Sequence, residues 1–420
     1  MDFSLVLPIL VTAVGLYLLI RLRCFFILHP IRTAREFVSA LNNREARRSL
    51  FLALAGTLGV GNIFGVSAGI MIGGAGSLFW LFLSTFFAMV IKYAETLLVF
   101  DGGICRGGMS ALLGKVFVRA RRFLSPLYAA LMLLLAFFMG SAMQSAALFD
   151  VAEQTLSLSP KVTAFILIIL LTPCLVKGGN KIENITEIII PMTTIIYILM
   201  CFAVIFCNLS RIGEVINSIF TSAFNFKSAV GGGVSFLAVK EGFARGILSN
   251  EAGVGTSAMA HSRSQGRTPH VAGLFAMCEV FFDSILLCML TGFAILLSVP
   301  DISLFSTPMA LVSAAFRFVL GGVSSLLLPL TIFAFAYATI ICWYYYGREC
   351  ASLYFPSVSK VYPFIFIAFV LFSGLIRSDF LLYVIDVLLL FMSVMTLSAI
   401  VKKVERIADF ALKPKNKNPE

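Results

Sequence analysis

The stretch that decides the fold is Gly56-Thr57-Leu58-Gly59-Val60-Gly61-Asn62-Ile63-Phe64-Gly65, inside a long apolar run. Its first six residues contain three glycines, and each glycine weakens a helix by about 1 kcal/mol relative to alanine. Thr57 and Asn62 add polar groups at a depth where lipid offers no hydrogen-bond partner. Irregular backbone inside a bilayer is tolerated only where it is buried in protein or lines a cavity. We therefore predict a transmembrane helix that is broken here, with the unwound part forming a binding site.

The composition is that of a membrane protein. The chain has 420 residues, of which 60% are hydrophobic and 13% are charged, and its mean hydropathy is +0.98. Soluble domains average about 25% charged residues. Many of the apolar runs approach the roughly 20 residues that a helix needs to cross a bilayer. We predict an all-α polytopic protein embedded in a lipid bilayer.

The net charge of +11 does not indicate a nucleic-acid partner. The basic residues lie between apolar segments, which is the positive-inside pattern of membrane proteins, and nothing resembles a compact basic binding fold. The nine cysteines form no CxxC pair and the three histidines are far apart, so we expect no zinc-type site, no disulfide framework and no cofactor. No obligate protein partner is evident. The N-terminus lacks the basic region of a signal peptide, so the first apolar run is expected to be a retained helix.

The apolar runs predict about eleven transmembrane helices, near residues 4–28, 50–73, 77–100, 123–149, 161–176, 184–207, 234–261, 271–298, 323–347, 360–376 and 380–401. The basic segment after the first helix is expected to form an interfacial helix, and the stretch 208–233 is expected to be irregular. Basic clusters follow the first, third and eleventh helices, which places the C-terminus in the cytoplasm and the N-terminus outside.

The seventh predicted helix contains a second break, Ser249-Asn250-Glu251-Ala252-Gly253-Val254-Gly255. With the first helix set aside, ten helices remain, and the two broken ones each begin a set of five. Broken segments at matching positions indicate an inverted repeat with the substrate site between its halves. We predict four regions: an N-terminal helix and basic segment (1–49), a first five-helix repeat (50–207), a linker and second repeat (208–401), and a basic, disordered cytoplasmic tail (402–420).

The first break offers groups suited to an amino acid and a cation. Unwinding at Gly59 and Gly61 exposes N–H groups that begin the second half-helix, whose positive dipole end favours a carboxylate. The carbonyl groups suit a hard cation, and Asn62 offers one carbonyl oxygen and two donors. Gly61, Gly65, Gly69 and Gly73 also recur every four residues, and for the last three we favour close helix packing.

The second break adds Ser249 and Asn250, which can cap a half-helix and line the site. Glu251 would be a carboxylate near the midplane, and intramembrane ionisable residues are functional candidates by default. The alternative is a capping acid that pairs with Arg245 or Lys240.

Other charged residues also lie within apolar helices. Glu279 and Asp283 lie one turn apart on one helix face. Two carboxylates there must be compensated by a bound cation, by protonation or by water, or by an ion pair with Arg245 or Lys240. Together with Glu251 they are the candidate coupling acids. Lys92 and Glu95 are interpreted as a local ion pair that snorkels toward the cytoplasmic end of the third helix.

Three motifs together resemble the signature of the alanine or glycine:cation symporter family. They are residues 56–63 followed by 73–80 (GGAGSLFW), residues 244–253 (ARGILSNEAG) with Ala260-His261, and residues 342–347 (CWYYYG). Their order and spacing are similar to the family's from about residue 30 to 400. Members of that family are sodium-coupled importers of alanine or glycine, with a fold like the five-plus-five inverted repeat of the leucine transporter. The resemblance also implies a prokaryotic inner membrane.

The resemblance implies roles for three residues outside the breaks. Gln144 would accept a hydrogen bond from the substrate ammonium, with an interhelical hydrogen bond as the alternative. Trp343 would limit side-chain size, with core packing as the alternative, and Thr339 would be a sodium ligand. We assign substrate binding to Gly59, Val60, Gly61, Asn62, Gln144, Leu248, Ser249, Asn250 and Trp343, and sodium binding to Gly56, Gly59 and Thr339.

The sequence departs from the family pattern close to these positions. Val60 stands where a threonine is usual and Ala338 where a hydroxyl residue is usual; the other departures are Ala75, Ser141, Ala146 and Cys342. Sodium prefers about five or six oxygen ligands. A lost hydroxyl can be replaced by a carbonyl oxygen or by water, but the coupling ion and the exact substrate are left open.

These observations predict a sodium-coupled symporter that imports a small amino acid, alanine or glycine with D-alanine also considered, by alternating access. The alternatives are a proton-coupled or uncoupled carrier, and a substrate sensor that kept the fold and lost coupling. An enzyme is not expected, because no nucleophile–base pair or metal cluster is present in the sequence.

Overall fold

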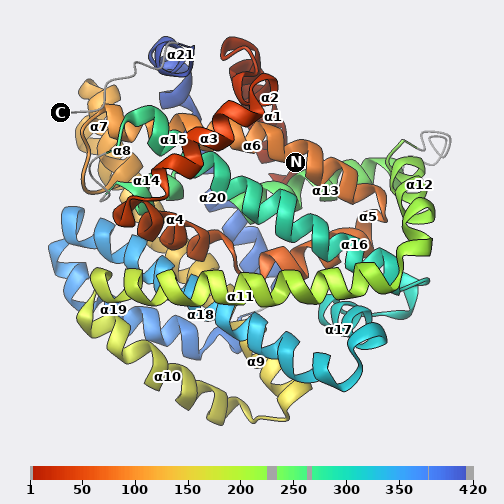
Figure 1. Ribbon diagram of the computed structural model, residues 1–420. Helices are drawn as coiled ribbons and strands as arrows, with labels where there is room; N and C mark the ends of the chain where they lie inside the picture. The colour runs from red at the N-terminus through yellow and green to blue at the C-terminus, as the bar shows by residue number, and fades with distance from the viewer. Residues whose placement is uncertain (1–2, 225–233, 263–266, 377, 413–420) are drawn as a thin grey trace.

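The computed structural model describes residues 3–224, 234–262, 267–376 and 378–412, which are helical over most of their length and contain no strand (Figure 1). The expectations for residues 225–233, 263–266 and 413–420 lie outside the described residues. The predicted disorder of the tail 402–420 is wrong for its first part, because Val404–Leu412 form a helix, α21. Each of the predicted apolar runs is helical, which confirms an all-α polytopic membrane protein.

The helices at the predicted apolar runs fall into three groups. Six segments are long and apolar enough to cross a membrane; they contain α6 (Gly76–Asp101), α8–η3–α9 (Arg121–Leu135, Ala136–Met143, Gln144–Leu156), α11 (Gly179–Cys207), α15–η6–α16 (Pro269–Val280, Phe281–Cys288, Met289–Ser298), α18 (Ser324–Tyr354) and α20 (Ser378–Lys402). Three shorter apolar helices are α1 (Phe3–Arg21), α10 (Pro160–Lys177) and α19 (Pro356–Leu371). The third group is the two broken helices.

Both predicted breaks are present. The first broken helix consists of α4 (Arg44–Thr57), η1 (Gly61–Gly65) and α5 (Val66–Gly73), and its two parts are bent by 51°. The second consists of α13 (Val234–Asn250) and α14 (Thr256–His261). Glu251, Gly253 and Gly255 between them all have positive φ, which ends α13 and turns the chain before α14 begins.

The broken helices pack against each other in opposite directions. The second part of the first helix, α5, lies on the first part of the second, α13, and α14 lies on α4. Glycines allow the α5–α13 contact to be close: a Cβ on Gly73 would lie 3.0 Å from the Leu237 carbonyl oxygen, and one on Gly69 would lie 3.2 Å from Arg245 Cγ. The predicted packing role is confirmed for these two glycines.

Several boundaries differ from the sequence expectation. The first helix ends at Arg21, and a short α2 (Phe25–Leu28) follows after Cys24, whose φ is +48°. The stretch 208–233 is not irregular throughout, because η4 (Leu209–Arg211) and α12 (Ile212–Ala223) lie within it. Val215 and Ile219 are buried on one face of α12, which packs against α6 and α13.

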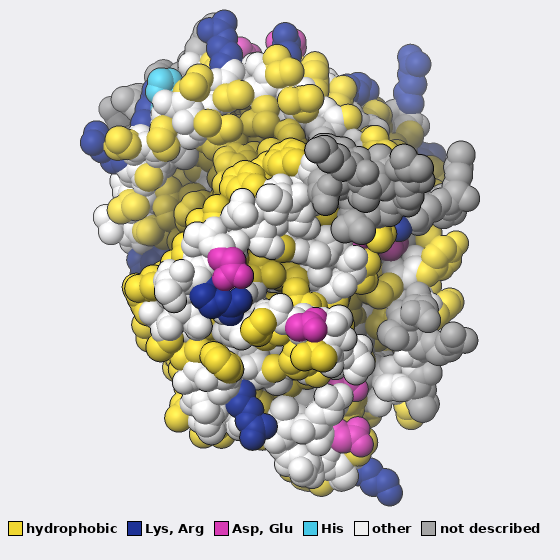
Figure 2. All heavy atoms as spheres, turned by 90° about the vertical axis from the view of Figure 1, so that its right-hand side faces the viewer, with side chains coloured by type: hydrophobic (Ala, Val, Ile, Leu, Met, Phe, Trp, Pro, Cys, Tyr) yellow, Lys and Arg dark blue, Asp and Glu magenta, His cyan; other side chains and the backbone are white. Residues whose placement is uncertain are grey.

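Small peripheral helices complete the two ends of the bundle. One end carries the amphipathic α3 (Pro30–Ala40) with α7 (Gly108–Val116), η2 (Val118–Ala120) and α21 (Val404–Leu412). At the other end, α16 is connected to α18 by η7 (Ile302–Leu304), α17 (Pro308–Leu320) and η8 (Gly321–Val323). The short η9 (Ser373–Leu375) connects α19 to α20. The α3 helix confirms the predicted helix in the basic segment. Figure 2 shows the end with α12 and α17, where charged side chains are few and scattered.

Candidate functional site

Three stretches of π-helix surround the first break. They are η1, which carries Gly61 and Asn62; η3, which ends immediately before Gln144; and η6, which carries Asp283 and Ser284. Such wide turns are rare and occur frequently at functional sites, because the extra residue in the turn re-aims the side chains that follow. Here η1 and η6 contact each other, and α18 packs on both α4 and η3.

At the first break, predicted residues from three segments converge. The Val60 N–H donates to Gln144 Oε1 at 3.0 Å, so the glutamine oxygen occupies one of the donors expected to hold a carboxylate. The Thr339 hydroxyl lies 3.3 Å from the Leu58 carbonyl oxygen and 3.0 Å from the carbonyl oxygen of Phe335 in its own helix. A Cβ on Gly59 would lie 2.7 Å from Gln144 Oε1 and 3.0 Å from Thr339 Oγ1. A side chain at position 59 would therefore push the flexible end of Gln144 aside.

Trp343 forms one wall of this region. It is fully buried, and its indole N–H donates to the Gly56 carbonyl oxygen at 3.2 Å. Gly140 in η3 lies directly against the ring, and a Cβ there would overlap with the Trp343 side chain. The indole is thus fixed by a hydrogen bond on one side and by a glycine on the other.

Asp283 connects the first break to the second. Its carboxylate accepts hydrogen bonds from the Asn62 side chain, from Ser249 Oγ at 2.8 Å and from Ser284 Oγ at 2.8 Å. Asn250 donates to Ser284 Oγ at 3.3 Å and accepts from the Ala252 N–H at 3.1 Å. Five polar side chains from the two breaks and η6 therefore form one buried network, which includes four predicted site residues.

The two other predicted substrate residues lie differently. Nothing lies within 4 Å of a Cβ built on Gly61, so this glycine borders open space. The Leu248 side chain faces α1 and α20, where it lines a crevice with Leu7 and Leu389. Leu248 could therefore contribute to the site only through its backbone, near the C-terminal end of α13.

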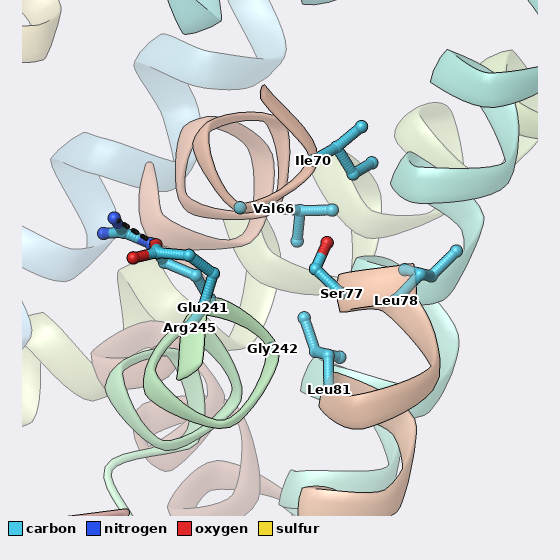
Figure 3. A pocket seen from close by; sticks show the side chains of 9 residues that line it. Val66, Ile70, Ser77, Leu78, Leu81, Glu241, Gly242 and Arg245 are labelled. Carbon is cyan, nitrogen blue, oxygen red and sulfur yellow. Dashed lines mark hydrogen bonds and ion pairs between the residues drawn. The ribbon is translucent and has the colours of Figure 1, made fainter. Parts of the chain in front are cut away.

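A narrow crevice lies between α5, α6 and α13 (Figure 3). Arg245 and Glu241 of α13 form an ion pair at 2.9 Å on one side, and the apolar side chains opposite are Val66 and Ile70 of α5 with Leu78 and Leu81 of α6. The crevice is too narrow to admit a water molecule. The predicted alternative that Arg245 pairs with Glu251 or Glu279 is wrong, because the pair is with Glu241.

The interpretation of Lys92 as a snorkelling residue is also wrong. Its side chain is fully buried, and its ammonium lies 3.2 Å from Glu279 Oε1 and 4.0 Å from Glu95 Oε1. The sequence showed only that Lys92 and Glu95 lie close together inside an apolar helix. The hydrogen-bond partners of the Lys92 ammonium lie on α14 and α15, more than 160 residues further along the chain.

The bundle of apolar helices, with two broken helices crossing at a buried polar site, defines a secondary transporter architecture. Comparison with known proteins agrees: the sequence profile of the sodium:alanine symporter family matches residues 1–417, and the chain belongs to this family. It is therefore a transporter and not an enzyme.

Two relatives illustrate the similarity. The chain is 30% identical over 362 residues to the sodium/alanine symporter AgcS of Methanococcus maripaludis, which covers 81% of this chain and 79% of the relative. It is 28% identical over 382 residues to the Bacillus subtilis protein named probable sodium/glutamine symporter GlnT, which covers 87% of this chain and 77% of the relative. These relationships support cation-coupled transport of an amino acid through a multi-pass membrane protein.

Proposed function

We propose that this protein is a sodium-coupled symporter that imports alanine or glycine by alternating access between two inverted halves, 50–207 and 208–401. The observation that carries the proposal is the convergence of Gln144 and Thr339 on the unwound residues of the first break, beside the polar network of the second. The antiparallel packing of α5 on α13 and of α14 on α4 supports an inverted repeat.

The substrate carboxylate would take the N–H groups that begin η1. The first N–H groups of a helix lack partners within the helix, and the one on Val60 is held by Gln144 Oε1 in this conformation. A carboxylate is a stronger acceptor than an amide oxygen, so it would displace the glutamine. The displaced Gln144 oxygen would then accept from the substrate ammonium, together with carbonyl groups at the C-terminal end of α13.

The Trp343 indole faces the first break as a fixed wall, which limits the size of the substrate side chain. Trp343 has little freedom to withdraw, because Gly56 and Gly140 hold it from two sides. This rigidity favours alanine and glycine, including D-alanine, over larger amino acids such as glutamine.

Sodium would bind beside the substrate at the Thr339 hydroxyl. The Leu58 carbonyl oxygen is its nearest neighbour on the first broken helix, and the Gly56 and Gly59 carbonyl oxygens are the other candidate ligands. Neutral oxygens of this kind suit a hard monovalent cation. A second candidate, proton coupling, is favoured by the ionisable side chains buried beside the second break.

We also propose that the C-terminus is cytoplasmic and the N-terminus lies outside. Arg21 at the end of α1 forms an ion pair with Glu405 of α21, and Arg406 pairs with Asp101 at the end of α6. The end of α1 and the chain's last helix therefore share one face, and α1 begins on the other. Basic residues of α3 and of the segment around α7 support a cytoplasmic position for the shared face.

Equilibrium binding of labelled alanine to the purified protein tests this proposal. We expect binding to require sodium rather than choline, competition by glycine, and weaker competition by glutamine. Gln144→Ala should weaken binding strongly. Ser145→Ala is the matched control, because the Ser145 hydroxyl bonds to the Ser141 carbonyl oxygen within its own helix. Equal loss in both variants, or sodium-independent binding, would contradict the proposal.

A further inference from the structure

Four ionisable side chains that the proposed substrate and sodium sites do not use meet beside the second break. They are Lys92 and Glu95 on α6, Glu251 in the break and Glu279 on α15, and we refer to them as the buried charge cluster. No more than 1% of any of these residues is exposed. Lys92 is the one basic residue of the cluster, and it faces three carboxyl groups.

The hydrogen bonds of the cluster are unevenly shared. The Lys92 ammonium donates to Ser257 Oγ at 2.7 Å, to Thr256 Oγ1 at 3.2 Å and to Glu279 Oε1 at 3.2 Å. An ammonium group has three donors, so these bonds use all of them. Glu279 accepts a further bond from Ser257 Oγ and is the carboxylate that the ammonium neutralises.

The other two carboxyl groups lack such compensation. Among the described residues, neither carboxyl oxygen of Glu95 or of Glu251 has a hydrogen bond of good geometry. Glu95 faces the backbone N–H groups of Gly253 and Gly255, and Glu251 faces the Thr256 hydroxyl, but these contacts lack the geometry of a hydrogen bond. If all three acids were ionised, the cluster would hold a net charge of about −2 in the buried interior, where an uncompensated ion is costly. Two neutral carboxylic acids remove this cost.

Glu251 also has a strained backbone. Its φ is +54°, a region that non-glycine residues other than Asn and Asp rarely adopt and that costs of order 1–3 kcal/mol. The turn between α13 and α14 already uses glycine at two other left-handed positions, Gly253 and Gly255. A glutamate at the third position brings a carboxyl group to the cluster at the cost of local strain.

A histidine connects the cluster to the end of the bundle that carries α3 and α7, which we call the basic end. His261 Nδ1 lies 3.0 Å from Ser49 Oγ, which donates to the Ala46 carbonyl oxygen and accepts from Arg267. With the serine hydrogen placed on the Ala46 carbonyl oxygen, Nδ1 is the donor and Nε2 carries the lone pair. His261 Nε2 is buried, has no hydrogen-bond partner among the described residues and lies 4.0 Å from Glu279 Oε2.

We propose that Glu95 and Glu251 form a proton-binding site that exchanges protons with the basic end of the bundle through Glu279 and His261. In each transfer an O–H bond breaks at Glu95 or Glu251 and one forms at the Glu279 carboxylate. That bond then breaks as an N–H bond forms at His261 Nε2, which leaves an imidazolium. An N–H bond of this imidazolium breaks when its proton passes to water, and the neutral ring is restored. The proposal rests on the proposed function in one respect, that the broken helices move during transport.

Movement of α14 would change the charge balance. Two of the three Lys92 hydrogen bonds go to Thr256 and Ser257, the first residues of α14. When α14 shifts, the ammonium is released toward Glu95 and Glu251, which favours loss of a proton. Other titratable or charged groups also face the cluster and contribute to this balance: Asp283 on η6, Tyr128 on α8, Cys342 and Tyr346 on α18, and Arg267 before α15.

Infrared spectroscopy of the full-length protein in lipid tests the protonation directly. At neutral pH we expect absorption in the carbonyl-stretch region of protonated carboxylic acids. Glu95→Gln and Glu251→Gln should each remove part of this absorption, and the double variant should remove most of it. Glu187→Gln is the matched control and should remove none, because Glu187 forms an ion pair with Arg48 at 2.9 Å. Absence of the absorption in the unmodified protein, or its survival in the double variant, would overturn the proposal.

A second measurement tests the route and does not depend on the glutamate variants folding. Sodium-driven alanine uptake by the unmodified protein in vesicles should vary with the pH on the side of the basic end, and His261→Gln should lose this dependence. A pH-independent rate in the unmodified protein would overturn the route. The infrared result needs no transport, so loss of sodium-driven uptake with retained absorption would refute the proposed function and leave the proton site standing.

Discussion

Gly59→Ala is the substitution whose effect follows most directly from the geometry. Gly59 does not have a positive φ, so alanine can adopt its backbone conformation and the effect is steric. The new Cβ would lie 2.7 Å from Gln144 Oε1 and 3.0 Å from Thr339 Oγ1. The flexible end of Gln144 would move away, and its hydrogen bond with the Val60 N–H would be lost.

Gly59→Ala should lower the alanine affinity much more than it lowers the stability of the fold. Loss of a neutral hydrogen bond lowers the free energy of unfolding by about 1 kcal/mol. In the proposed complex the Gln144 oxygen accepts from the substrate ammonium, and the introduced methyl group beside the Gln144 amide would keep it from that position. A hydrogen bond to a charged ligand group contributes roughly 1.5–3 kcal/mol, so its loss should raise the alanine Kd about 10- to 150-fold. Gly65→Ala is the control, because its Cβ would lie 4.0 Å from Arg245 Cδ, an ordinary contact.

Sodium-dependent equilibrium binding of labelled alanine, with thermal unfolding of the same samples, measures both effects. We expect Gly65→Ala to bind like the unmodified protein and Gly59→Ala to bind far more weakly with a small change in Tm. Unchanged alanine affinity in Gly59→Ala would refute the assignment of the Gln144 position as a substrate contact.

Three further outcomes follow from other contacts. Thr339→Val removes one oxygen from the proposed sodium site and should raise the sodium concentration for half-maximal alanine binding roughly 10-fold or more. Gly140→Ala places a Cβ in overlap with the Cβ and Cγ atoms of Trp343 and should lower the free energy of unfolding by about 1–3 kcal/mol, visible as a lower Tm. Partial burial raises the pKa of Glu36, but hydrogen bonds from two basic neighbours, one of them His270, outweigh it and lower the pKa below the usual 4.5. The contact of α3 with α15 should therefore be stable above pH 4.5 and weaken as the pH falls further, which hydrogen exchange of α3 would detect.

Local composition was sufficient to predict the two breaks. Glycines at 56, 59 and 61 weaken a helix whatever it packs against, and Ser249 and Asn250 carry the same kind of local signal. The structure places the breaks at these positions because backbone propensity, unlike side-chain contact, depends on residues that are adjacent in the chain.

Long-range partners were not predictable in this way. Gln144 was assigned by resemblance, and its contact with Val60 joins residues 84 positions apart. Lys92 was interpreted as a snorkelling lysine, because the sequence does not reveal its hydrogen-bond partners on the distant helices α14 and α15.

Two helices near one end of the bundle were missed for another reason. No helix was predicted between the spans 271–298 and 323–347, where α17 lies; its cap is Thr307 before Pro308, a short polar signal within an otherwise apolar stretch. In α12, burial of Val215 and Ile219 against neighbouring helices stabilises a segment that looked irregular in the sequence.

Uptake of labelled alanine into proteoliposomes tests the central claim most directly. Inward sodium, inward proton and no gradient should be compared at the same membrane potential. The account predicts accumulation above equilibrium with inward sodium, and loss of that accumulation in Thr339→Val at low sodium. Equal uptake in all three conditions, or accumulation driven by protons alone, would contradict sodium coupling at the first break.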